Sequence, residues 1–284
     1  MIIFETANQR LTPTYLVNWW DWSHDDNRTP NRHKFTGNKN TTGILSKASL
    51  KRMRTAIQIL NHTSKSKKVY VRKTNSYFRF KINFITLTLP CKQKDSDKFI
   101  RRYMLERFLR WMRSKGANKY IWKAETQKNG NIHFHITTSL FIHHAEVRKQ
   151  WNSICFANDY TNDKTDNPNS TDVHSVKNDK YIESYMVKYL SKSDETRRKV
   201  NCKIWDCSSN LKEKFPIITE NIPDEEIHNF INQAEHKIED TFYQVYCYNH
   251  NNLIHFPNLY RIWKEFCNQD KFKDKQIKEQ LFIE

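Results

Sequence analysis

The sequence predicts an α+β protein, because its apolar residues follow two different periods in alternating segments. In some segments every second residue is apolar, as in a strand with one buried face. In others the spacing is three or four residues, as in an amphipathic helix. From residue 76 onward the order is strand, helix, strand, strand, helix, strand, and then a further helix. This is the order of the ferredoxin-like split unit, so we expect an antiparallel sheet with its helices on one side.

Local signals support the first two of these elements. The first strand, "SYFRFKINFITLTLP", ends at Pro90, which cannot donate to a sheet ladder. The helix over residues 96–116 has Ser96 or Asp95 as its N-cap and Gly116 as its stop. Both elements therefore have a defined end.

The remaining elements of the unit are equally short. We expect strand, strand, helix, strand and helix over residues 119–127, 131–139, 144–154, 172–176 and 179–192. Asn129-Gly130 is a strong turn signal between the first two of these strands, which predicts a β-hairpin.

Segments of different composition flank this unit, and we expect three domains. Residues 1–76 form an N-terminal extension with a tryptophan cluster and a basic amphipathic helix. The tryptophans would either pack on the core, which we favour, or bind a nucleic-acid strand. Residues 77–211 form the central domain. Residues 212–284 form a C-terminal α/β extension, with a helix over 223–238, a hairpin of 241–249 with 253–256, and a closing helix.

The net charge of +17 is unevenly distributed along the chain. From Arg28 to Lys94 there are 17 Lys or Arg and no Asp or Glu. From Leu211 to Glu284 there are 9 basic and 13 acidic residues. A basic first third beside an acidic last third predicts that one part of the molecule binds a polyanion.

The sequence shows no sign of export or membrane insertion. Six cysteines include no CxxC pair, which favours a reducing compartment. No apolar run approaches the length of a membrane span, and the first ten residues lack an export signal. We therefore expect a soluble cytoplasmic protein with no membrane partner.

Two histidines on one strand are the first candidate functional residues. In "NIHFHITTS", His133 and His135 alternate with apolar residues, so both imidazoles point to the face opposite the core. An HxH pair alone is equally typical of a solvated sheet face. A third ligand on the neighbouring strand would favour a metal site instead.

The hairpin turn decides whether Glu125 is that ligand. A two-residue loop would pair Glu125 with Phe134, on the wrong face. A three-residue loop with Gly130 in the left-handed conformation of a bulge would pair Glu125 with His133. Gln127 has the same parity and is the reserve ligand. Two imidazoles and a carboxylate with open positions suit Mn²⁺ or Mg²⁺, and Zn²⁺ could bind in vitro.

The second candidate site lies on the helix over residues 179–192. Tyr181, Tyr185 and Tyr189 form one stripe of this helix, with Lys188 and Lys192 beside it. The stripe could be an aromatic seam packed on the sheet. A phenol near an ammonium group, facing a metal-bound phosphate, would instead be a nucleophile for phosphodiesters.

Taken together, these motifs resemble those of the HUH endonucleases, specifically the two-tyrosine rolling-circle replication initiators of small single-stranded-DNA phages. "FITLTLP" resembles the hydrophobic strand motif of the family, "HFH" its metal motif, and "YMVKYLSK" its two-tyrosine motif. "IWDCSSNL" resembles a segment that follows the tyrosine helix in these initiators. The resemblance covers roughly residues 77–211.

The resemblance implies a site-specific single-stranded DNA nickase and strand transferase. Tyr185 and Tyr189 would be the nucleophiles and form a 5′-phosphotyrosine, while Lys188 and Lys192 would contact the phosphate or backbone. The implied partners are origin single-stranded DNA and a host helicase and polymerase, in the bacterial cytoplasm. A plasmid initiator or transposase of the same superfamily, or a non-catalytic single-strand or origin-binding protein, remains the alternative.

Overall fold

The computed structural model describes residues 8–19, 43, 45–71, 74–163, 165–175, 197–218, 222–239, 243–273 and 282–283. These residues form helices and largely antiparallel sheets, which confirms the α+β class. The chain divides into two compact units. Unit 1 contains residues 1–38 and 214–270, and unit 2 contains residues 39–213 and 271–284.

The main sheet of unit 2 has five strands in the order β8-β5-β7-β6-β9, and every neighbouring pair is antiparallel. The strands are β5 (Asn83–Leu87), β6 (Tyr120–Thr126), β7 (Ile132–Thr138), β8 (Thr171–Ser175) and β9 (Trp205–Cys207). The chain passes from β5 to β6 across the position of β7, and β6 then returns as β7 through a hairpin. β9 extends the edge of the sheet beside β6, whereas we expected the segment after residue 200 to cover the sheet.

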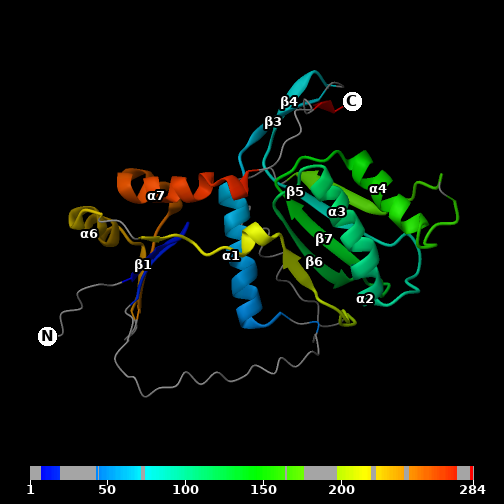
Figure 1. Ribbon diagram of the computed structural model, residues 1–284, viewed down its shortest axis with the longest axis horizontal. Coiled ribbons are helices and arrows are strands. Elements are labelled where there is room, and N and C mark those ends of the chain that lie inside the picture. Colours follow the sequence, from blue (N-terminus) through cyan, green and yellow to red (C-terminus); the bar gives the residue numbers. More distant parts are fainter. Residues whose placement is uncertain are drawn as a thin grey trace, which may run out of the picture. The chain divides into compact units, whose positions relative to one another are not determined.

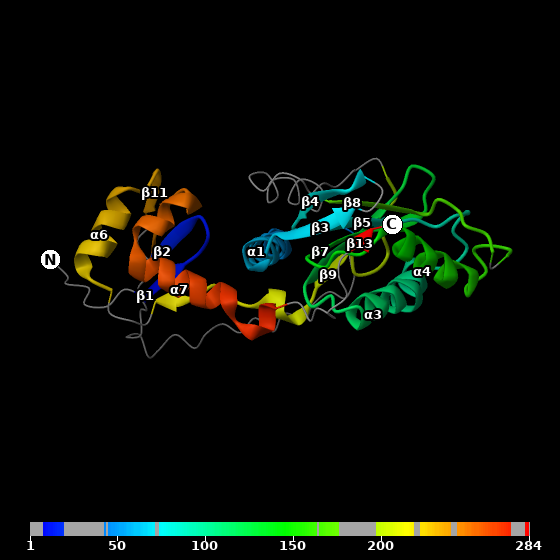
Figure 2. The ribbon, with the colours of Figure 1, turned by 90° about the horizontal axis from the view of Figure 1, so that it is seen from above.

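Helices cover one face of this sheet, as Figures 1 and 2 show for α3 and α4. They are α2 (Asp97–Phe99), a π-helical turn η2 (Ile100–Leu105), α3 (Glu106–Ser114) and α4 (His144–Phe156). Ser96 is the N-cap, since its hydroxyl accepts a hydrogen bond from the Phe99 backbone N–H at 3.2 Å, and Gly116 has a φ of 96° beyond the last turn. Ile132, Phe134 and other β7 residues of this face pack against these helices.

The expected strand over residues 76–90 is two strands in the structure. β4 (Ser76–Phe80) pairs with β3 (Lys67–Val71), while β5 pairs with β7 and β8. Apolar alternation runs through both strands, so periodicity alone did not show the break at residues 81–82. β13 (Phe282–Ile283) adds to β3 in parallel.

The amphipathic helix expected before these strands is α1 (Lys47–Thr63), and the structure confirms it. Ser46 caps its N-terminus, accepting a hydrogen bond from the Ser49 backbone N–H at 3.1 Å. Met53, Ile57 and Leu60 are fully buried, as their helical spacing predicted.

Unit 1 contains a second five-stranded antiparallel sheet, in the order β10-β1-β2-β12-β11. Its strands are β1 (Asn8–Leu11), β2 (Tyr15–Trp19), β10 (Ile217–Ile218), β11 (His236–Glu239) and β12 (Tyr243–Cys247). Because strands from both ends of the chain pair in this sheet, the compact units are not the three consecutive segments expected from the sequence. The assignment of residues 77–211 as one functional domain stays a prediction.

Two helices, α6 (Asp224–Asn232) and α7 (Pro257–Asn268), complete unit 1, and α7 is the expected closing helix. The helix expected over residues 223–238 ends at Asn232, and the residues after it form β11. The expected hairpin partner of β12 was also wrong. β12 pairs with β11 and β2, while residues 250–255 form a 3₁₀ helix. Among the described residues, no helix is both long and apolar enough to cross a membrane.

Candidate metal centre

The turn between β6 and β7 sets the register of the candidate site. The Gly130 N–H donates to the Gln127 carbonyl at 2.9 Å, and the Gln127 N–H donates to the Asn131 carbonyl at 2.8 Å. Three residues thus form the loop, and Gly130 has a φ of 84°, which a residue with a side chain rarely adopts. Glu125 therefore lies opposite His133, and the pairing expected from a three-residue loop is confirmed.

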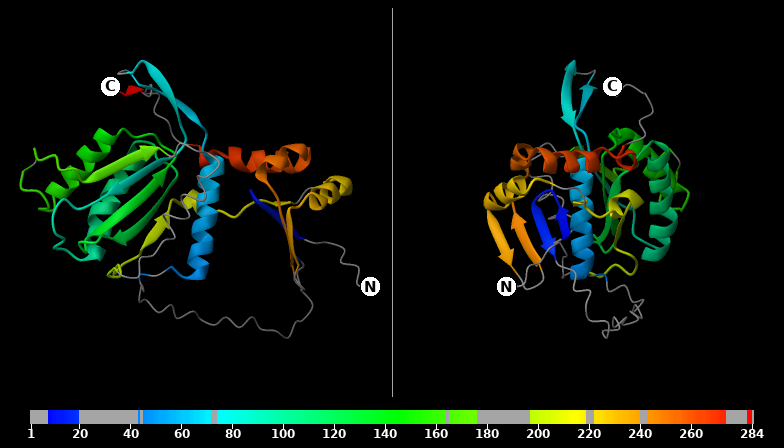
Figure 3. Two further views of the ribbon diagram at one scale, coloured as in Figure 1. Left: turned by 180° about the vertical axis from the view of Figure 1, so that it is seen from behind. Right: turned by 60° about the vertical axis from the view of Figure 1, so that its left-hand side comes forward.

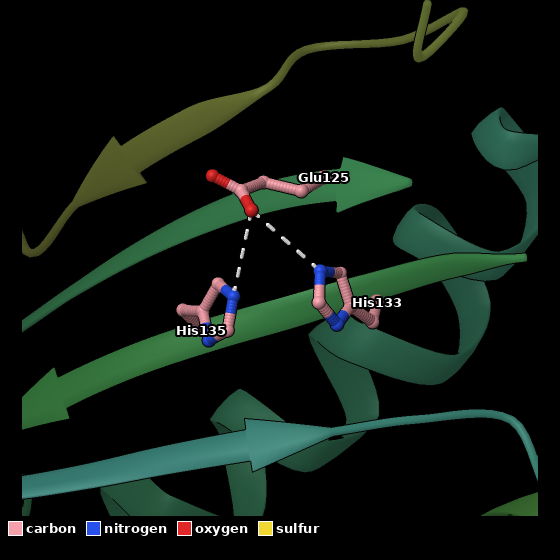
Figure 4. Close-up of side chains that lie close together, drawn as sticks. All are labelled: Glu125, His133 and His135. Atoms are coloured by element: carbon pink, nitrogen blue, oxygen red, sulfur yellow. Dashed lines mark ion pairs between the residues drawn. The ribbon is translucent and has the colours of Figure 1, made fainter. Parts of the chain in front are cut away.

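Glu125, His133 and His135 gather on the face of the sheet that the helices leave uncovered (Figure 4). The Glu125 Oε2 atom lies 3.7 Å from His133 Nε2 and 3.6 Å from His135 Nε2. These separations are too long for hydrogen bonds. Ligand atoms that share a cation at about 2.1 Å lie roughly 3 to 3.5 Å apart, so a small movement of the carboxylate would close the site around an ion.

The burial of His133 shows that these residues fit a metal. Its Nε2 atom is buried and has no hydrogen-bond partner among the described residues. A buried polar atom left without a partner carries a desolvation cost, which a coordinated cation would remove. Two imidazole nitrogens and one carboxylate oxygen could hold Mg²⁺, Mn²⁺ or Zn²⁺ and leave further positions open. These atoms do not fix the identity of the metal.

The protonation states of the cluster favour cation binding at neutral pH. Burial would raise the pKa of Glu125, but the imidazoles of His133 and His135 and the Lys123 ammonium outweigh it and hold that pKa well below its usual range. Burial lowers the pKa of His133, with the positive charges of His135 and Arg197 acting in the same direction against Glu125. An ionised carboxylate and a neutral imidazole are the forms that bind metals.

Lys123 is a site residue that the sequence reasoning missed. Its Nζ atom contacts the second carboxylate oxygen of Glu125, Oε1, and its side chain is only 5% exposed. Burial lowers the pKa of Lys123, and the Glu125 carboxylate opposes this shift. Because Lys123 holds Oε1, the other oxygen is directed toward the histidines. The signal was present in the sequence, since residues two apart on a strand share a face.

Thr86 is a second residue that the sequence reasoning did not assign. It lies on β5 directly opposite His135, and its Oγ1 atom is 3.2 Å from His135 Nδ1. If Nδ1 carries the proton and donates to Thr86, the Nε2 lone pair is directed toward Glu125. Metal-binding histidines usually have such a partner on the other ring nitrogen.

Two arginines attach the chain that follows the tyrosine motif to this hairpin. The Arg197 guanidinium donates to the Thr126 carbonyl at 2.8 Å, at the end of β6. Arg198 donates to the Gly130 carbonyl at 2.6 Å and makes a two-pronged ion pair with Asp97, at 2.7 and 2.8 Å. Residues 197–198 are therefore fixed beside the turn that positions Glu125.

The other predicted site residues cannot be placed in the same way. Tyr185, Tyr189, Lys188 and Lys192 lie outside the described residues. Gln127, the reserve ligand, follows β6 and closes the turn through its backbone. Its role as a ligand stays a prediction.

Comparison with known families agrees with this location of the site. Residues 82–194 match the family model of the replication-associated protein ORF2. No curated protein and no solved structure matches the chain. The matched segment contains the metal cluster and the two-tyrosine motif. The chain is thus similar to replication-associated proteins over this segment, which implies a role in the initiation of phage DNA replication.

Proposed function

We propose that the protein is a metal-dependent nickase and strand transferase for single-stranded DNA, which initiates and ends rolling-circle replication. The observation that carries this proposal is the Glu125, His133 and His135 cluster, with its partnerless buried imidazole nitrogen, inside the replication-associated segment. Of the described residues, these three offer the group of ligand atoms best suited to a catalytic metal.

The proposed chemistry divides the work between the cluster and the tyrosines. Mg²⁺ or Mn²⁺ held by the cluster, with Gln127 in reserve, would polarise the scissile phosphate. The hydroxyl oxygen of Tyr185 or Tyr189 attacks phosphorus and loses its proton. A 5′-phosphotyrosine bond forms, the P–O3′ bond breaks, and the leaving 3′ oxygen takes up a proton. Lys188 and Lys192 favour the phenolate and neutralise the phosphate.

Two tyrosines allow the reaction to finish without an energy source. The phosphotyrosine keeps the energy of the diester, so a free 3′-hydroxyl can attack it and restore a DNA linkage. During termination the second tyrosine cleaves the regenerated origin while the first still holds the 5′ end. The released 3′-hydroxyl then attacks the first linkage and closes a circle.

We also propose that β5 to β8 and their helices form the ferredoxin-like unit of an HUH endonuclease domain over residues 77–211. The antiparallel order β8-β5-β7-β6 supports this, because it is the order of the fourth, first, third and second strands of such a unit. The free 3′-hydroxyl would be extended by host enzymes, a polymerase and a helicase, in the bacterial cytoplasm.

The decisive experiment is to trap a covalent adduct. The protein is incubated with Mn²⁺ and a 3′-labelled single strand that carries the origin, and a denaturing gel then separates protein-linked DNA from free DNA. We expect an adduct that maps to Tyr185 or Tyr189, that at least one single Tyr→Phe mutant retains, and that the double mutant loses. Tyr181→Phe is the control and should nick normally.

The alternatives give different results in this experiment. A non-catalytic origin-binding protein would bind the strand but form no adduct with any metal, and that result would overturn the proposal. A plasmid initiator or transposase of the same superfamily would form the adduct. It would differ in the products, since a phage initiator should release a closed circle from a single-origin template.

A further inference from the structure

A two-stranded ribbon of unit 2 has one face with no role in the proposed chemistry. The ribbon consists of β3 and β4, which extend beyond the main sheet in Figures 1 and 3. Lys68 pairs with Arg79, and Tyr70 pairs with Tyr77. Cross-strand partners share a face, and so do residues two apart on a strand. These four residues therefore form one surface, which we call the outer face of the ribbon.

The opposite face fixes the ribbon to the body of unit 2. Val69 and Phe80 on that face are fully buried. The rings of Phe78 and Phe80 lie 6.1 and 5.2 Å from the ring of Phe141, both in edge-to-face arrangements. β4 then leads after two residues into β5, the strand that contains Thr86 of the metal centre. The outer face is therefore held in a defined position in the same unit as the site.

Two like charges oppose one another on the outer face. Lys68 and Arg79 are both exposed and occupy directly paired positions of the two strands. Like charges opposite one another destabilise a strand pair, and an anion between them removes this cost. Residues 64–81 contain seven Lys or Arg and no Asp or Glu, so the ribbon itself supplies no counter-charge.

Two tyrosines next to this pair offer a stacking surface. The rings of Tyr70 and Tyr77 lie 5.0 Å apart, and the Tyr70 hydroxyl donates to the Asn75 side chain at 2.8 Å. Tyr77 is 68% exposed, the largest exposure among the large hydrophobic residues that the structure describes. A ring held by its neighbour and open to solvent can stack on a nucleic-acid base with little loss of side-chain freedom.

We propose that the outer face of the ribbon binds the single-stranded DNA that flanks the cleavage site. A base would stack on Tyr77, and Lys68 and Arg79 would contact the phosphates on either side. The charge of the units favours this occupant, since unit 2 carries 40 Lys or Arg and 18 Asp or Glu, whereas unit 1 carries 8 and 13. The inference rests on the proposed function only in taking DNA, rather than another polyanion, as the ligand.

Binding without a metal tests the face independently of cleavage. Fluorescence anisotropy in EDTA measures the affinity of the full chain for a labelled oligothymidylate and for an abasic strand of the same length. Tyr77→Ala should weaken oligothymidylate binding by at least about fivefold and leave abasic-strand binding unchanged. Tyr77→Phe should bind like wild type, whereas Tyr77→Leu, which keeps apolar bulk without a ring, should bind like the alanine variant.

The paired charges should act on both strands. The double variant Lys68→Gln/Arg79→Gln should weaken both and reduce the slope of log Kd against log salt by about 1.4, or 0.7 for each phosphate that the variant no longer neutralises. Tyr103→Ala and the double variant Arg107→Gln/Arg110→Gln are matched controls. These residues are exposed on the helical segment that covers the other face of the main sheet. They should leave stacking unchanged.

Two outcomes would overturn the inference. One is wild-type affinity of Tyr77→Ala for oligothymidylate, and the other is an equal loss on the abasic strand, which would make Tyr77 a structural residue. Selective loss on duplex DNA would also contradict it, because it would show the ribbon to be a groove reader. A protein that shows the expected binding pattern but forms no adduct with Mn²⁺ would refute the proposed function and leave this inference standing.

Discussion

Asp97 allows a quantitative test of how the end of the tyrosine segment is anchored. Its carboxylate is 3% exposed and accepts two hydrogen bonds from Arg198, at 2.7 and 2.8 Å. It also accepts one from the Gln93 side chain and one from the Asn201 backbone, each at 2.8 Å. Asp97→Asn keeps the shape of the side chain but removes the charge and replaces one acceptor by a donor.

The expected loss of stability follows from the burial of the two partners. Removing one member of a buried ion pair costs about 3–5 kcal/mol. The Arg198 side chain is 39% exposed and can turn toward water, which reduces this cost. We therefore expect Asp97→Asn to lower the free energy of unfolding by about 2–4 kcal/mol. Asp206→Asn is the control, with a more exposed carboxylate that pairs with two half-exposed lysines, and should cost less than about 1 kcal/mol.

The pH dependence gives the sign of the effect. Burial would raise the pKa of Asp97, but the hydrogen bonds from Arg198, Gln93 and Asn201 outweigh it, so the pKa lies below its usual value of 3.8. A carboxyl whose pKa is lowered in the folded state stabilises the fold above its unfolded pKa. That contribution is lost as the pH falls through the folded value. The difference between wild type and Asp97→Asn should therefore be full at pH 7 and should shrink below about pH 4.

Hydrogen exchange of the β6 and β7 amides measures this difference in unit 2 alone, and urea unfolding measures it for the whole chain. Asp206→Asn is measured in parallel at each pH. A loss under about 0.5 kcal/mol for Asp97→Asn at pH 7, or a loss that does not change with pH, would refute the reasoning.

Three further predictions concern the metal and DNA. Glu125→Ala should abolish both Mn²⁺ binding, measured by electron paramagnetic resonance, and cleavage, whereas Gln127→Ala should retain both; the reverse result would make Gln127 the ligand. Because burial lowers the pKa of His133 below 6.5, Mn²⁺ affinity should change little between pH 7.5 and 6.5 and should fall only at lower pH, as a pH series of titrations would show. Replacing three basic residues of α1 by Gln should weaken binding to all single strands and flatten its salt dependence, and an unchanged slope would show that this face points away from DNA; the residues are Lys51, Arg52 and Arg54.

The metal cluster could be predicted from the sequence because its geometry depends on local rules. Alternation along β7 places His133 and His135 on one face, and the strand period of two requires no tertiary information. The parity of Glu125 depends on a single loop, and an Asn-Gly pair with one residue before it restricts the loop to two lengths. The structure selects the longer loop, with Gly130 in the left-handed region.

Contacts between distant segments could not be predicted in this way. Thr86 contacts His135 across 49 residues of chain, and Arg198 contacts Asp97 across 101. A sequence period shows which face a residue lies on, but it does not show which strand lies beside it. The sheet of unit 1 failed for the same reason, because β1 and β2 pair with strands more than 200 residues later.

The β6–β7 turn links the two halves of the proposed site. Gly130 sets the register that places Glu125 beside the histidines, and its carbonyl accepts a hydrogen bond from Arg198 at 2.6 Å. Thr126, at the end of β6, likewise accepts from Arg197 and donates to the Arg198 carbonyl. The chain leaving the tyrosine motif is thus attached to the same few residues that position the carboxylate. A nucleophile and a metal must meet within about 3 Å of one phosphate, so a common anchor reduces the number of segments whose positions must agree.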